Sequence, residues 1–112
     1  MTKSDLQEAR ARVLLQDAML ADLSFATRMA CAFEAVYFYV VGGNEGPMPK
    51  ATSPLPDEQS LLSGLERNDC SPDDTQLGTR LLQWYVNQWE LPPPPCSLEM
   101  AIAWARRIIK SD

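Results

Sequence analysis

Apolar residues recur at steps of three and four along five segments of the chain, which is the spacing of one helix face. None of these segments alternates apolar and polar residues as a half-buried strand would. The pattern predicts an all-α fold, a compact bundle of about five helices in which residues 1–112 form a single domain. The first helix is expected over about residues 5–21, after a capping box made by Ser4 and Gln7. Its apolar residues fall on two sides, so we expect it to contact more than one neighbour.

The second segment is the most apolar part of the chain and predicts a central helix that is buried nearly all round. Asp22 or Ser24 can cap its start, and Gly42–Gly43 ends it. Arg28 and Glu34 are its only charged residues. The apolar positions that repeat at helical spacing are Phe25, Met29, Phe33, Val36 and Val40.

Two segments rich in proline or glycine separate the remaining helices. Residues 42–56 hold three glycines and four prolines without any periodic spacing, which predicts a mobile surface loop. Residues 92–95 are consecutive prolines, which favour polyproline II and cannot continue a helix. We expect this connector to be a rigid spacer that lets the last helix fold back. Recognition by an SH3- or WW-type domain is the alternative.

Three shorter helices follow the loop. The third is expected over about residues 56–69, the fourth from Ser71–Pro72 to about Leu91, and the fifth after Ser97. Serine caps a helix start and proline suits its first turn, so these boundaries have a physical basis. The third helix is expected to bury Leu61, Leu62 and Leu65. The core positions expected of the fourth are Leu77, Leu81, Tyr85 and Trp89, and those of the fifth are Leu98, Ala101, Ile102, Ala105, Ile108 and Ile109.

Four features follow one another along most of the chain. They are an aromatic-rich second helix (residues 32–39), a proline-led short helix with Leu61–Leu62, a helix with Trp84–Tyr85, and an alanine-rich last helix (residues 99–105). This order resembles the HEPN-like family of helical bundles. The ribonucleases of that family use an arginine followed some residues later by a histidine. Because this chain has no histidine, the resemblance implies a non-catalytic member that binds a partner or its own copy.

The chain is acidic, with a formal net charge of −5 and a pI near 4.6. Such a chain repels phosphate backbones, so we expect no nucleic-acid partner. The densest basic group, Arg106–Arg107 with Lys110, is expected to offset the negative end of the last helix. The longest apolar stretch, residues 29–41, is well short of the ~20 residues that span a bilayer, and residues 1–12 show no signal sequence. We therefore expect a cytoplasmic protein with no membrane partner.

The most informative chemical feature is the complete absence of histidine. It removes histidine-based acid/base catalysis, Ser-His and Cys-His nucleophile pairs, and nearly all zinc chemistry. The cysteines, Cys31, Cys70 and Cys96, have no Cys-x-x-Cys spacing and are expected to be reduced thiols. The acidic pairs Asp57–Glu58 and Asp73–Asp74 fall in first turns, where acids favour the helix dipole. The sequence therefore predicts no enzyme activity, no catalytic residue, no metal and no cofactor.

Arg28 and Glu34 are candidate site residues because they are charges in an apolar helix. Six residues apart, they point to different sides of the helix and cannot pair with each other. Either each reaches the surface or pairs with another helix, or both line a polar pocket together with Tyr37.

A second candidate is an interaction surface. The apolar surplus of so small a bundle predicts a homodimer, because surplus apolar area is commonly covered by a second copy. The expected contact is the first helix, through Leu15, Met19 and Leu23, or the fourth helix, through Trp84. Trp84 is rotated about 100° from the expected core face, which places it at the edge of that face or in solvent. An exposed Trp84 or Trp104 would mark a partner surface.

These features make protein–protein interaction the leading functional hypothesis. The first alternative is a small-ligand-binding or enzymatic domain that uses the polar pocket around Arg28 and Glu34. The second is a small acidic chaperone of the secretion type, by analogy of size and charge alone. A pocket that holds carboxylates of perturbed pKa would favour the enzyme, and a flat apolar patch would favour interaction.

Overall fold

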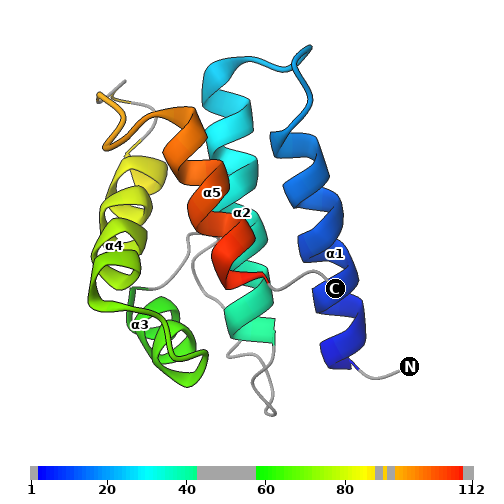
Figure 1. Ribbon diagram of the computed structural model, residues 1–112, viewed down its shortest axis with the longest axis vertical. Coiled ribbons are helices and arrows are strands. Elements are labelled where there is room, and N and C mark those ends of the chain that lie inside the picture. Colours follow the sequence, from blue (N-terminus) through cyan, green and yellow to red (C-terminus); the bar gives the residue numbers. More distant parts are fainter. Residues whose placement is uncertain (1–2, 43–57, 88–89, 91–92, 110–112) are drawn as a thin grey trace.

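The computed structural model describes residues 3–42, 58–87, 90 and 93–109, and the side chains from residue 8 onward. This part of the chain forms α-helices and no strand, which confirms the all-α bundle (Figure 1). The helices are α1 (Lys3–Ala18), α2 (Phe25–Gly42), α3 (Glu58–Arg67), α4 (Pro72–Val86) and α5 (Leu98–Ile108). Of the predicted mobile loop, Gly42 belongs to α2, and residues 43–56 lie outside the described residues.

Helix α2 is the centre of the bundle, as predicted. It contacts all four other helices, with α1 on one side and α3 and α4 on the opposite side (Figure 1). Helix α5 packs against both α2 and α1. Phe25, at the first position of α2, is the exception to the predicted burial, since it stays 47% exposed. The buried residues of α2 are Met29, Ala32, Phe33, Ala35, Val36, Val40 and Val41.

Serine side chains cap the helix starts, as the sequence predicts. The Ser71 Oγ accepts the Asp74 N–H at 3.1 Å, and the Ser97 Oγ accepts the Met100 N–H at 3.1 Å. At the start of α2, Ser24 and not Asp22 makes the equivalent bond. Each of these bonds satisfies a backbone donor that the first helical turn leaves without an intrahelical partner.

Helix α3 ends in a Schellman motif around Asp69, whose φ of 54° lies in the left-handed region. The Cys70 N–H donates to the Leu65 carbonyl and the Asp69 N–H to the Glu66 carbonyl, both at 3.1 Å. On its buried side, α3 presents Leu61 and Leu65 but not Leu62, which is exposed. The prediction for Leu62 is wrong because this leucine lies about 100° around the helix from Leu61.

Helix α4 ends at Val86, earlier than the predicted end near Leu91. The cause is Asn87, whose side-chain Nδ2 donates to the Gln83 carbonyl at 2.8 Å. A continuing helix would use this carbonyl to accept the Asn87 backbone N–H, which bonds to the Trp84 carbonyl instead at 3.3 Å. The asparagine side chain therefore competes with the helical backbone and closes the last turn.

Trp104 joins α5 to the start of α4. Its indole is fully buried, and its Nε1–H donates to the Asp74 carbonyl at 2.9 Å. The Arg107 guanidinium also reaches Asp74, with 2.7 Å between Nη2 and Oδ1. Trp104 is thus a core residue and not an exposed partner surface. Arg107, which was expected only to offset the helix dipole, pairs with a carboxylate of another helix.

Candidate functional site

Arg28 and Glu34 each contact a different neighbouring helix. The Arg28 Nε donates to the Ala18 carbonyl at 2.9 Å and so satisfies an acceptor at the end of α1. Glu34 is hydrogen-bonded to Tyr85 of α4. Tyr37 is half-buried on α2, with its ring centroid 6.1 Å from that of Phe33. Each of the two charges therefore engages another helix, as one of the two predicted alternatives has it.

The pKa values of Tyr85, Cys31 and Cys96 are raised, which favours the protonated form of each group. Burial, the Glu34 charge and the hydrogen bond with Glu34 raise the pKa of Tyr85 to about 12. Burial raises the pKa of the Cys31 thiol, and the negative charges of Glu34 and Asp17 raise it further. Burial alone raises the pKa of the Cys96 thiol. Because the thiolate is the reactive form of cysteine, these two thiols are poor nucleophiles near neutral pH.

Some of the residues predicted to form the interaction surface are buried in the core, and others are exposed to solvent. Leu15 is buried and offers no exposed contact, so this part of the prediction is wrong. Trp84 is largely buried as well, at the edge of the core. Leu15 shares the core face of α1 with Ala11 and Ala18 at helical spacing, and it therefore points inward. Met19 is 49% exposed and Leu23 is half-buried, both beside the turn between α1 and α2.

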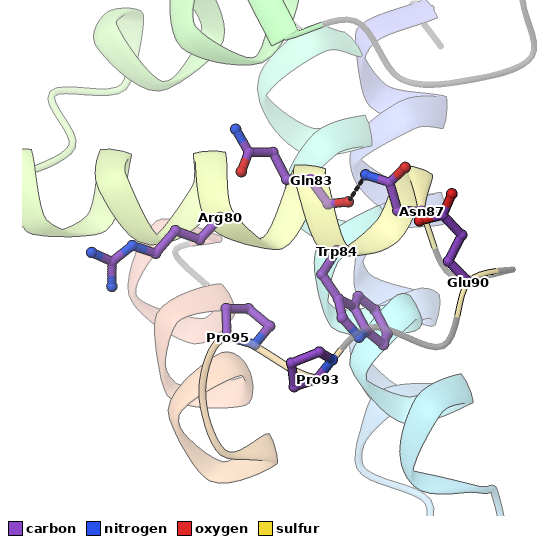
Figure 2. Close-up of a pocket in the computed structure, with 7 residues that line it drawn as sticks. All are labelled: Arg80, Gln83, Trp84, Asn87, Glu90, Pro93 and Pro95. Carbon is purple, nitrogen blue, oxygen red and sulfur yellow. Dashed lines mark hydrogen bonds between the residues drawn. The ribbon is translucent and has the colours of Figure 1, made fainter.

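A cleft that sequence reasoning missed lies between α4 and the proline connector. Its volume is about 450 Å³, within the range of ligand-binding pockets. Figure 2 shows Trp84 projecting from α4 toward Pro93 and Pro95, which form the other wall. We call it the Trp84 cleft, and its lining residues are Arg80, Gln83, Trp84, Asn87, Glu90, Pro93 and Pro95.

The Trp84 indole is the notable group of this cleft. The residue is only 7% exposed, yet its Nε1–H donates to no acceptor within the described residues. Trp104, in contrast, is buried with its indole N–H bonded to a carbonyl. A buried donor without a partner costs about 1–3 kcal/mol, and such donors are rare in folded proteins. The acceptor for this N–H must come from solvent or from an occupant of the cleft.

Opposite charges stand at the two ends of the cleft. Arg80 lies at one end and Glu90 at the other, with Trp84 between them (Figure 2). Both are exposed, and neither makes an ion pair within the part of the chain that the structure describes. Arg80, Trp84 and Asn87 share one face of α4 because they are four and seven residues apart.

Among the described residues, no group of three or more cysteine, aspartate or glutamate side chains could hold a metal ion. No helix of the described part combines the length and the apolar character needed to cross a membrane.

No family model, curated protein or solved structure matches the chain. The HEPN-like resemblance therefore stays a prediction.

Proposed function

We propose that this chain is a non-enzymatic interaction protein that binds a partner in the Trp84 cleft. The observation that carries the proposal is the buried indole N–H of Trp84, which has no acceptor within the described residues and lines an open cleft. Interfaces concentrate their binding energy in a few well-buried anchors, and tryptophan and arginine are enriched among them. Trp84 and Arg80 in one cleft fit that description.

The chemistry of the chain supports binding over catalysis. The sequence has no histidine, and the pKa of both the Cys31 and the Cys96 thiol is raised, which disfavours their thiolates. The enzymatic alternative placed its pocket at Arg28 and Glu34, and both of these side chains are engaged with neighbouring helices. A cytoplasmic, non-catalytic HEPN-like bundle remains compatible with this function.

A second copy of the chain is the alternative partner. Met19 is 49% and Leu20 51% exposed beside the turn between α1 and α2, where they leave apolar surface uncovered. Apolar surface of this kind favours self-association through a two-fold axis. The proposed homodimer would use this turn, which leaves the Trp84 cleft available to another partner.

Site-specific photo-cross-linking in the native host tests the function. A photoreactive residue at Gln83, in the cleft, is compared with one at Gln76, which is also exposed on α4. Seven residues separate them, so they share a helix face about 10 Å apart along the axis. We expect cross-links from position 83, far fewer from position 76, and loss of the former in Trp84→Phe, which lacks the N–H. Equal cross-linking from both positions, or none from position 83, would contradict the proposal.

A further inference from the structure

We infer that the Trp84 cleft binds an extended peptide segment, with an acidic side chain at the Arg80 end and a basic one at the Glu90 end. This inference rests on the proposed function and names the chemistry of the partner. Three features of the cleft carry it: the hydrogen-bond donor at its base, the amides along its rim, and the charges at its ends.

The donor at the base of the cleft selects a carbonyl. An indole N–H can donate and cannot accept, so its partner must present an acceptor oxygen at a largely dehydrated position. A backbone carbonyl of a peptide meets this need without burying a charge. Pro93 and Pro95 have no backbone N–H, so the opposite wall offers that carbonyl no competing donor. Their rings and the Trp84 indole leave an apolar slot for one side chain of the segment.

The amides at the rim match the alternating groups of a peptide backbone. Asn87 uses its Nδ2 on the Gln83 carbonyl, which orients its amide and leaves the Oδ1 to accept a hydrogen bond. The exposed Gln83 side chain can both donate and accept. An extended segment presents N–H and C=O groups in turn, so it can pair with both amides while its carbonyl meets Trp84. A purely apolar ligand would leave the Trp84 N–H without an acceptor.

Helix geometry sets the length of the segment. Arg80 and Asn87 are seven residues apart on α4, which corresponds to about 10 Å of helix rise. An extended chain advances about 3.3 Å per residue, so about three residues bridge this distance. The acidic side chain meets Arg80 at the start of this stretch, and the basic side chain follows at the Glu90 end, at least about three residues further along the segment. Their opposite signs complement Arg80 and Glu90, and a uniformly acidic segment would meet repulsion at Glu90.

Selection from a random-peptide library on the full chain tests the inference. We expect enriched peptides to carry an acid and a base at least about three residues apart, with an apolar residue between them. Binding of one enriched peptide is then measured by fluorescence polarisation. Trp84→Phe is expected to weaken it about tenfold, the effect of one hydrogen bond of ordinary strength. Arg80→Glu is expected to replace the selected acid by a base.

The test uses two variants, Trp84→Phe and Arg80→Glu, so that one can be interpreted if the other does not fold. Arg80 is exposed, so Arg80→Glu leaves the core intact and remains informative even if Trp84→Phe unfolds. The inference is overturned if no peptide is enriched, or if Arg80→Glu selects the same peptides as the wild-type protein. Cross-links from position 83 in the host without any enriched peptide would keep the proposed function and discard the peptide as its ligand. Enriched peptides without cross-links in the host would discard the proposed function alone.

Discussion

Replacing Gly64 by alanine tests how closely α3 approaches α2. Gly64 is buried in α3, directly over Val40 of α2. A Cβ at position 64 would lie 2.7 Å from the Val40 Cγ2, 2.8 Å from its Cβ and 2.9 Å from its carbonyl oxygen. These distances are well below the roughly 3.5–4.0 Å of carbon–carbon contact, and the carbonyl cannot rotate away. The two helices must separate, and the 3.1 Å bond from the Arg67 Nη2 to the Val40 carbonyl must lengthen.

The sign of the effect follows from two opposing terms. In an exposed helix interior, replacing glycine by alanine stabilises by about 1 kcal/mol because the backbone loses less freedom on folding. Overpacking a core costs about 1–3 kcal/mol, and the weakened Arg67 hydrogen bond adds to that cost. We therefore expect Gly64→Ala to lower the free energy of unfolding by about 1–2 kcal/mol.

Urea unfolding followed by circular dichroism measures this change. Gly78→Ala is the matched control, because its Cβ would meet only side-chain ends, at 3.1 Å from the Leu65 Cδ1 and 3.2 Å from the Trp104 Cζ2. The Leu65 methyl can rotate and the Trp104 ring needs to move by only a few tenths of an ångström, so we expect Gly78→Ala to stay within about 1 kcal/mol of the wild-type protein. Ser63→Ala, at an exposed site of α3, reports helix propensity alone. A Gly64→Ala protein as stable as Ser63→Ala would refute the close approach of the two helices.

Ser71→Ala removes the acceptor of the Asp74 N–H, so we expect urea titration to show a loss of about 1 kcal/mol in unfolding free energy. Glu34→Gln removes a charge that raises the pKa of Tyr85, so ultraviolet titration should show that pKa falling from about 12. In the wild-type protein, the pKa of Tyr85 is about 12 in the folded chain and about 10 in the unfolded chain. The free energy of unfolding that depends on protonated Tyr85 is therefore complete below about pH 10 and is lost as the pH rises through about 12. Sedimentation equilibrium is expected to give a dimer that Met19→Asp converts to the 12.5 kDa monomer. A Tyr85 pKa that Glu34→Gln leaves unchanged would contradict the expectation for that variant. A wild-type mass constant at 12.5 kDa would contradict the dimer.

Local chemistry explains why most of the fold could be predicted from the sequence. The helix starts at Ser71 and Ser97 depend on residues within one turn of each other, and the structure confirms both. The central place of α2 follows from its nearly continuous apolar sequence. The predicted end of α4 near Leu91 was wrong, because the end depends on whether the Asn87 amide bonds to the backbone or points to solvent, which the sequence does not specify.

The candidate site could not be predicted because it exists only after the chain folds back. Helical spacing places Trp84 at the edge of the core face, and only the path of the connector decides what covers that edge. Pro93 and Pro95 follow Trp84 by nine and eleven residues, beyond the reach of any helical pattern. The same limit applies to α1, where spacing places Leu15 and Met19 on one face, but the helix ends at Ala18 and Met19 stays exposed.

The most direct test of the central claim is the NMR signal of the Trp84 indole N–H in the presence of a peptide selected on the full chain. Trp84→Phe identifies the resonance, and Trp104, already bonded to the Asp74 carbonyl, serves as the internal reference. We predict that peptide binding moves the Trp84 indole proton downfield, as expected when a donor gains an acceptor, and leaves that of Trp104 in place. Peptide binding that leaves the Trp84 indole signal unmoved would contradict the claim that this N–H recognises the partner.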